Sequence, residues 1–185
     1  KVSFRDANLR YAGAGADSLS DITFDVAPGE TVGIIGGTGS GKSSLVNMIP
    51  RFYDASQGSV CIDGVDVKDY TLDELRHKVG VVPQKAVLFA GTIADNIRWG
   101  KQDATEAEID EALEIAQAME FVDGPENGIY FKITQGGKNL SGGQKQRLTI
   151  ARAVVRKPEI LILDDTASAL DFATDASLRK AIREK

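Results

Sequence analysis

The chain is poor in several features whose absence excludes whole classes of protein. It has one cysteine, Cys61, so an internal disulfide framework is excluded, and this low cysteine usage fits a reducing compartment. No apolar run approaches the roughly 18 residues that a membrane-spanning helix requires. Basic residues are outnumbered, since 22 Lys and Arg face 27 Asp and Glu for a net charge of −5. A mildly acidic domain binds nucleic acid poorly through bulk charge, so we expect no nucleic-acid partner.

The chain does contain enough apolar residues for a folded core. Its 185 residues are 42% apolar and 26% charged, which suits one globular domain and not a disordered segment. Strands are predicted where apolar residues alternate or form short β-branched runs, at residues 2–9, 22–26, 31–35, 58–64, 79–82 and 160–163. Helices are predicted at residues 43–52, 72–78, 92–96, 106–121, 144–156 and 173–185. This order indicates an α/β domain with a helical subdomain.

A glycine-rich loop joins the predicted buried strand at 31–35 to the helix that follows. Residues 36–43 read GGTGSGKS and fit the phosphate-loop pattern G-x-x-x-x-G-K-[ST]. Glycines let backbone N–H groups turn around phosphate oxygens where a Cβ would clash. Lys42 would reach the β- and γ-phosphates, and the Ser43 hydroxyl would ligate Mg²⁺. The loop therefore predicts a nucleoside triphosphate site. Its candidate binding residues are Gly36, Gly37, Thr38, Gly39, Ser40, Gly41, Lys42, Ser43 and Ser44.

Two carboxylates follow the apolar run at 160–163. A magnesium ion beside a phosphate loop needs a carboxylate at the end of a neighbouring strand. Asp164 is the candidate metal-linked carboxylate, and Asp165 stands where a base or water-positioning group would act. Strand-end acids also cap turns, but in the same chain as a phosphate loop they favour a magnesium site.

A third motif resembles a sequence that is typical of one protein family. Residues 140–144 read LSGGQ, and this sequence resembles the signature of ATP-binding cassette (ABC) ATPases. A serine and two glycines at a helix start offer a hydroxyl and free N–H groups, which suits anion binding, although Ser141 alone would be a simple helix cap. The resemblance implies a P-loop NTPase (RecA-like) core with an antiparallel β subdomain and an inserted α-helical subdomain. It implies ATP and Mg²⁺ as cofactors. In this family a head-to-tail dimer places the signature over the partner's ATP, through the residues here numbered Ser141, Gly142, Gly143 and Gln144.

Further positions match this family across nearly the whole chain. Tyr11 lies where the family places an aromatic residue that stacks on adenine. Gln84 matches the Q-loop glutamine, which contacts Mg²⁺ or the attacking water and has a catalytic role. Asp171 ends the sequence SALD, which matches the D-loop that crosses the dimer interface. These roles are what the resemblance implies.

The resemblance is to exporters in particular. Residues 51–54, 62–66 and 88–93 resemble exporter-type nucleotide-binding domains. In those proteins the segment after the Q-loop glutamine docks on the membrane domain, so a membrane partner is expected near residues 85–97. The parent protein is then an integral membrane protein, and this segment lies at the cytoplasmic face.

The resemblance also predicts how the chain is divided. Residues 1–185 would form a single nucleotide-binding domain that is incomplete at its C-terminus, because the family's switch histidine lies on a later strand. The ATP-binding core would comprise residues 1–84 and 158–185. Residues 85–157 would form the helical subdomain with the signature.

Three positions depart from the family pattern. Most hydrolysing ABC subunits carry Glu after the strand-end Asp, whereas this chain has Asp165, whose carboxylate is set back by roughly 1 Å. The pair Thr166-Ala167 replaces the usual Pro-Thr, and QGG at 135–137 stands where exporters often place an acidic residue. The combination resembles the degenerate subunit of a heterodimeric exporter, although Asp165 alone also fits a slow homodimer.

The sequence thus predicts an ATP-hydrolysing motor domain of an ABC-type exporter. One alternative is a soluble ABC ATPase that is not coupled to transport. Another is an ATP-binding module that hydrolyses little, because of Asp165. Basic residues interleaved with apolar ones along the signature helix are typical of a solvated helix face, which disfavours a nucleic-acid patch. They are Lys145, Arg147, Arg152, Arg156 and Lys157.

Overall fold

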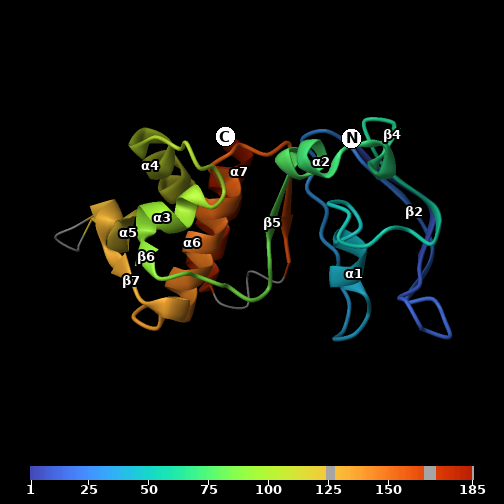
Figure 1. Ribbon diagram of the computed structural model, residues 1–185, viewed down its shortest axis with the longest axis horizontal. Coiled ribbons are helices and arrows are strands. Elements are labelled where there is room, and N and C mark those ends of the chain that lie inside the picture. Colours follow the sequence, from blue (N-terminus) through green and yellow to red (C-terminus); the bar gives the residue numbers. More distant parts are fainter. Residues whose placement is uncertain (124–127, 165–169, 185) are drawn as a thin grey trace. The chain divides into compact units, whose positions relative to one another are not determined.

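The structure is a computed structural model that describes residues 1–123, 128–164 and 170–184. It contains two compact units, Lys1–Val79 and Gly80–Lys185 (Figure 1). Among the described residues, no helix combines the length and the apolar character needed to cross a membrane.

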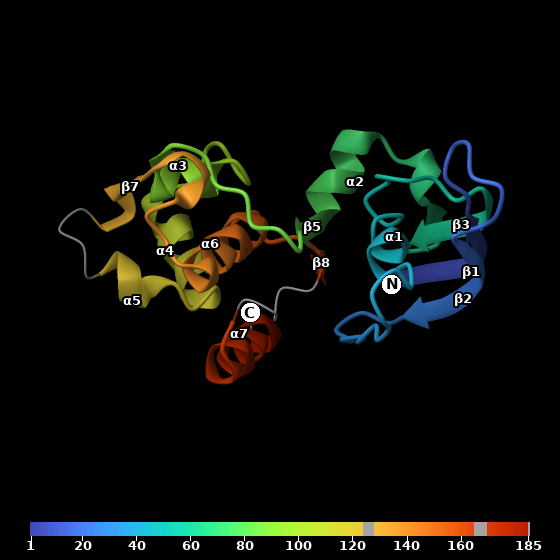
Figure 2. The ribbon, with the colours of Figure 1, turned by 90° about the horizontal axis from the view of Figure 1, so that it is seen from below.

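The first unit is built on an antiparallel sheet with the strand order β2-β1-β3-β4 (Figure 2). Its strands are β1 (Val2–Leu9), β2 (Leu19–Val26), β3 (Gln57–Ile62) and β4 (Val65–Asp66). Val2 of β1 pairs with Val26 on one side and with Ile62 on the other. The strand predicted at 58–64 ends earlier, at Ile62, because Asp63 and Gly64 turn the chain into β4 with positive φ angles of 50° and 85°, as a tight type I′ turn requires.

The helices of the first unit are short. They are α1 (Lys42–Val46), the 3-10 turn η1 (Val67–Asp69) and α2 (Leu72–Lys78). The prediction of α2 is confirmed, and its start is fixed by a capping box between Thr71 and Glu74. The predicted helix at 43–52 is too long, because the chain leaves α1 through turns with i→i−3 bonds. Pro50 explains this end, since it lacks an N–H group and disfavours helical backbone in the preceding residue.

Residues 31–35 do not form the buried strand that their β-branched run predicts. The described part of the chain gives them no strand, and Ile35 is 98% exposed. A strand that is apolar on both faces is stable only with a pairing neighbour and cover on both sides. The sheet of the first unit has no position for residues 31–35. The prediction is therefore wrong, and the phosphate loop follows an irregular segment.

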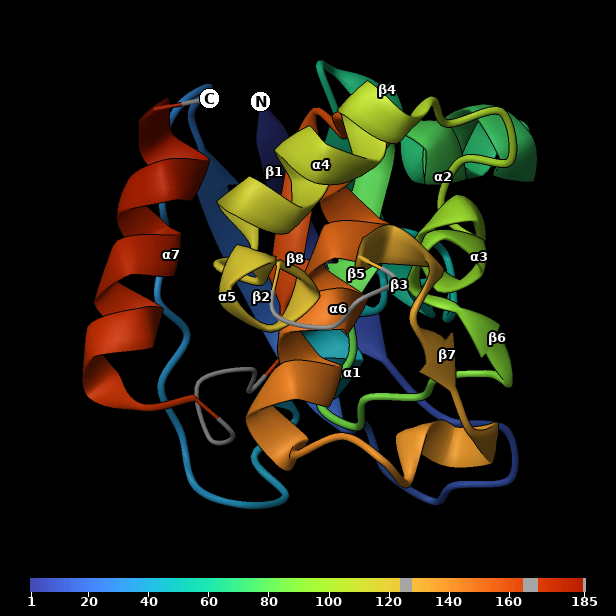
Figure 3. The same cartoon turned by 90° about the vertical axis from the view of Figure 1, so that its left-hand side faces the viewer.

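The second unit is mainly helical. Its helices are α3 (Ile93–Arg98), α4 (Glu106–Ile115), α5 (Met119–Val122), α6 (Gly142–Val154) and α7 (Phe172–Glu184), with 3-10 turns η2 (Gly128–Tyr130) and η3 (Gln135–Gly137). Helix α6 contacts both α3 and α4 (Figure 3). The side chains of Ile97, Ile109, Leu113 and Leu148 are almost fully buried in this unit. They make α6 the centre of its apolar core.

Two strand pairs complete the second unit. They are β5 (Val79–Val82) with β8 (Ile160–Leu163), and β6 (Gly91–Thr92) with β7 (Lys132–Ile133). The predictions of β5 and β8 are confirmed residue for residue. The predicted helix at 106–121 is interrupted, because Gln117 takes a left-handed φ of 56°. The N–H of Ala118 donates to the carbonyl of Leu113 at 2.8 Å, which closes α4 in the manner of a Schellman motif.

Candidate nucleotide-binding site

The phosphate loop of the first unit has the backbone that its glycines permit. Gly39 and Gly41 have φ angles of 80° and 88°, in the left-handed region that other residues rarely adopt. A Cβ at Gly41 would also lie 2.8 Å from Leu19. The Lys42 ammonium donates to the carbonyls of Gly36 and Gly37, at 2.6 and 2.9 Å. The positive charge of Lys42 therefore lies against the backbone of the loop itself. The side chains of Thr38, Ser40 and Ser43 are exposed.

The predicted adenine-stacking residue lies beside this loop. The hydroxyls of Tyr11 and Ser44 are 2.5 Å apart, so a hydrogen bond joins the end of β1 to helix α1. The Tyr11 ring meets the Tyr53 ring edge to face, with centroids 4.9 Å apart. Tyr11 is half-buried. The first unit thus brings an aromatic ring, a lysine and several hydroxyls together.

These groups fit a nucleoside triphosphate by their chemistry. Backbone N–H groups of a glycine-rich loop and a lysine suit phosphate oxygens, and serine hydroxyls suit Mg²⁺. The described residues contain no group of three or more His, Cys, Asp or Glu side chains able to hold a metal by themselves.

In the second unit, Asp164 and Gln84 follow adjacent strands. The N–H of Asp164 donates to the carbonyl of Val82 at 3.0 Å, so β5 and β8 end side by side. Gln84 comes two residues after Val82 and is exposed, whereas Asp164 is half-buried. The strand ends bring together two of the predicted metal-binding residues. The predicted catalytic residue Asp165 lies outside the described residues.

The signature opens helix α6 with a capping box. The Ser141 hydroxyl accepts from the N–H of Gln144 at 3.2 Å, and the Gln144 side chain accepts from the N–H of Ser141 at 3.0 Å. The hydroxyl proton of Ser141 is not used in the capping box. A Cβ at Gly142 would meet no atom within 4 Å, so packing within the unit does not require glycine there. The motif thus presents a hydroxyl and an open backbone at an exposed helix start.

Asp171 opens helix α7. Its carboxylate accepts from the Thr174 N–H at 2.9 Å and from the Thr174 hydroxyl at 2.7 Å. These bonds hold the pKa of the Asp171 carboxyl below its usual range. The rest of the predicted D-loop, residues 168 and 169, lies outside the described residues.

The solvated basic face predicted along the signature helix is wrong for three of its members, Arg147, Arg152 and Arg156, whose Nε atom is buried. Arg152 and Arg147 turn inward and donate to backbone carbonyls, Arg147 to that of Gln117 at 2.7 Å. Burial lowers the pKa of the Arg152 guanidinium. The sequence pattern could not predict these hydrogen bonds, because the carbonyl partners lie 30 and 65 positions away along the chain. The capping box, by contrast, was visible as Ser-x-x-Gln.

Comparison with known proteins gives the class of this domain. Residues 19–168 match the family model described as ABC transporter. The chain is 46% identical over 182 residues to the uncharacterized ABC transporter ATP-binding protein YfiB of Bacillus subtilis, covering 98% of the chain and 32% of the relative. It is 44% identical over 184 residues to the ATP-dependent lipid A-core flippase of Mannheimia succiniciproducens, covering 99% and 32%.

A solved structure agrees. The structure of a bacterial Atm1-family ABC exporter with ATP bound has a TM-score of 0.92 and 38% identity, over 99% of this chain and 32% of that chain. The chain belongs to the ABC transporter family. Within it, the chain is an exporter-type ATPase domain with a P-loop NTPase fold. The chain spans about a third of the length of the relatives it matches.

Proposed function

We propose that this domain binds and hydrolyses ATP to drive a membrane exporter. The observation that carries the proposal is the signature, which opens α6 with a hydroxyl and an unobstructed glycine in a chain that also has a phosphate loop. The phosphate loop and the signature each suit a phosphate group. We infer that they act on two different nucleotides, which two chains would supply. A head-to-tail dimer satisfies this, because each signature then covers the ATP of the other subunit.

We assign the following roles in ATP binding. Tyr11 stacks on the adenine, and the loop residues 36–44 bind the phosphates, with Lys42 on the β- and γ-phosphates. Mg²⁺ is held by the Ser43 hydroxyl, with Asp164 and Gln84 as its other protein partners, because hard cations prefer oxygen ligands. Asp165 positions the attacking water. Asp171 takes part across the dimer interface.

The partners are a second nucleotide-binding domain and a membrane domain. The membrane domain docks near residues 85–97, and the ATPase domain then lies at the cytoplasmic face of the membrane. Residues 1–84 and 158–185 act as the ATP-binding core, and residues 85–157 as the helical subdomain. The likeness to flippase and exporter ATPase domains supports these assignments.

The site built by the phosphate loop and the strand-end carboxylates of this chain is a weakened one, either the degenerate site of a heterodimer or the slow site of a homodimer. Asp165 is one methylene shorter than the usual Glu, and an error of about 1 Å in placing a catalytic group costs roughly two orders of magnitude in rate. The signature is intact and would complete the partner's site. Asp165 also supports a second candidate function, an ATP-binding module that hydrolyses little.

Both proposals are tested by ATP turnover of the complete transporter in lipid nanodiscs. We expect measurable hydrolysis in the wild type and a rise of about ten-fold or more in Asp165→Glu, since the longer side chain restores the reach of the carboxylate. Asp165→Asn, which has the same length and no charge, is the matched control and should not rise. An unchanged rate in Asp165→Glu would refute the weakened site. No hydrolysis in either protein would refute the motor function.

A further inference from the structure

Besides its apolar packing on α3, helix α6 is joined to the segment at residues 87–96 by the hydrogen bonds of one side chain, Arg152. The Arg152 guanidinium donates to three acceptors on that segment. Its Nη1 donates to the Val87 carbonyl at 2.9 Å, its Nε to the Asn96 carbonyl at 2.8 Å, and its Nη2 to the Asn96 Oδ1 at 2.9 Å. These bonds span 56 and 65 positions of sequence. One residue therefore fastens both ends of the segment to the signature helix.

The Asn96 side chain, which accepts from Arg152, also hydrogen-bonds to the backbone of the segment. Asn96 is 1% exposed. Its Oδ1 accepts from the Phe89 N–H at 2.9 Å as well as from Arg152, and its Nδ2 donates to the carbonyls of Phe89 and Thr92 at 2.9 and 3.0 Å. All four hydrogen-bonding positions of the amide are used. Movement of the guanidinium would thus disturb the backbone of the whole segment.

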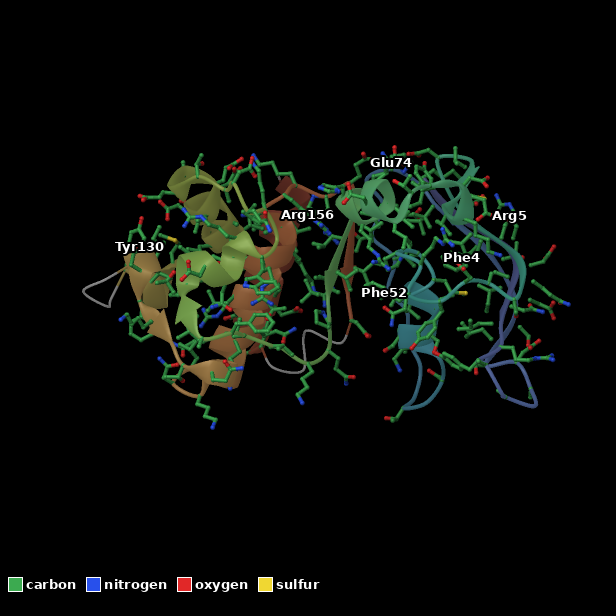
Figure 4. The ribbon with its side chains drawn as sticks, viewed as in Figure 1. Phe4, Arg5, Phe52, Glu74, Tyr130 and Arg156 are labelled. Atoms are coloured by element: carbon green, nitrogen blue, oxygen red, sulfur yellow. The ribbon has the colours of Figure 1, made fainter. Side chains whose placement is uncertain are left out.

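An aromatic pair, half-buried Phe89 and exposed Trp99, lies beside the same guanidinium. The Arg152 Cζ is 5.6 Å from the centroid of the Phe89 ring, which stacks on Trp99 at 4.6 Å. Trp99 is 67% exposed, and Val87 is 47% exposed. Arg156, which Figure 4 labels, lies two residues beyond the end of α6 and lines the same pocket as Val87, Trp99 and Arg152. The segment therefore offers an apolar outer surface whose inner side is fixed to α6.

A second attachment lies on the other side of the signature. The N–H of Gly136 donates to the Leu88 carbonyl at 3.2 Å. Gly137, with a φ of 64°, lies so close to Leu88 that a Cβ there would meet its Cδ1 at 3.2 Å. Residues 87–96 are thus joined to the loop before the signature and to the helix after it.

We propose that Arg152 is a positioning residue that couples the docking segment, residues 87–96, to the ATP-covering signature at the start of α6. The inference rests on the proposed function, which makes this segment the docking surface of the membrane domain. A displacement of the segment is transmitted through the fork of Arg152 to α6 and so to Ser141. Lysine cannot replace the fork, because a single ammonium cannot reach three acceptors in this fixed planar arrangement.

The attachment itself is tested in the 185-residue chain by amide hydrogen exchange. In Arg152→Lys we expect the Phe89 amide to exchange about ten-fold faster, while Leu148 in the middle of α6 changes less than about two-fold. Arg147→Lys is the matched control, since Arg147 lies on the same helix and binds a carbonyl outside the segment. Equal acceleration of both amides, or an unchanged Phe89, would show that Arg152 does not hold the segment, and would overturn the proposal.

The coupling is tested by ATP hydrolysis in the complete transporter. Arg152→Lys should lower kcat about ten-fold and leave KM for ATP within about two-fold, because the signature and not the phosphate loop is displaced. Arg147→Lys, the matched control on the same helix, should retain most of kcat. An Arg152→Lys protein with wild-type kcat, or with kcat lowered no more than in Arg147→Lys, would overturn the proposal. A wild type without hydrolysis would refute the proposed function, and hydrogen exchange would still decide the attachment.

Discussion

At the scale of single residues, the polar groups of the phosphate loop are engaged with one another. The Lys42 ammonium lies on the Gly36 and Gly37 carbonyls, and the Tyr11 hydroxyl on that of Ser44. Binding of a triphosphate would exchange the first set of bonds for bonds to phosphate oxygens. The Tyr11–Ser44 bond acts differently, because it holds an aromatic ring beside the loop.

The role of Tyr11 can be separated into ring and hydroxyl. We expect Tyr11→Phe to keep the dissociation constant for ATP within about two-fold, because the stacking ring remains. Tyr11→Ala should weaken it by about 2- to 10-fold, the equivalent of one aromatic contact of roughly 0.5–1.5 kcal/mol. Titration calorimetry of the chain with ATP and Mg²⁺ measures both. If Phe and Ala weakened binding equally, the hydroxyl and not the ring would be the important part.

At the scale of elements, a capping box begins each of four described helices, and the box at the signature differs from the others in its charge. Each helix has a capping box of a hydroxyl and the residue three positions on, in the pairs Thr71 and Glu74, Thr92 and Asp95, Thr105 and Glu108, and Ser141 and Gln144. Bonds within the boxes at α2 and α3 lower the pKa of Glu74 and Asp95. Only the signature uses a neutral amide. The Gln144 amide oxygen accepts the same hydrogen bond that a carboxylate accepts in the other boxes. It carries no negative charge, which would repel a phosphate at this helix start.

Gln144→Glu tests this reading of the signature. The capping box survives, so the free energy of unfolding should stay the same or rise by about 0.3–1 kcal/mol through the helix dipole. The ATP-dependent association of two chains should weaken at least about ten-fold, because the new carboxylate would face the γ-phosphate. Glu74→Gln, the opposite exchange in the box of α2, is the control and should leave association unchanged. A Gln144→Glu chain that associates like the wild type would contradict the placement of the signature over ATP.

Local signals predicted elements well where their ends depend on local chemistry. Helix α2 begins at a Thr cap, and β8 is a run of four apolar residues, so both were found with their bounds. The predictions fail where the structure of a segment, or the direction of a side chain, depends on residues far away in the sequence. The β-branched run at 31–35 lacks a pairing strand in its unit, and Arg152 binds carbonyls 56 and 65 positions away. The phosphate-loop and signature residues were predictable because glycine, serine and lysine stand at fixed spacings for a local reason.

At the scale of the whole molecule, the two phosphate-binding elements belong to different units. The phosphate loop lies in Lys1–Val79, and the signature lies in Gly80–Lys185. In the proposed head-to-tail dimer, the loop of one chain would pair with the signature of another. This arrangement makes a prediction that no site within a single chain shares, because two differently damaged chains can then supply one intact site between them.

That prediction is complementation between Lys42→Ala and Ser141→Arg. Each variant alone can form only dimers in which both sites are damaged, so neither should associate with ATP. A mixed dimer has one site with both defects and one site with none, since the Ser141→Arg chain contributes its loop and the Lys42→Ala chain its signature. We expect ATP-dependent dimers only in the mixture, measured by light scattering after size-exclusion chromatography, with the wild type as the positive control. If ATP were bound by the loop and signature of the same chain, mixing would restore nothing, and the head-to-tail arrangement would have to be abandoned.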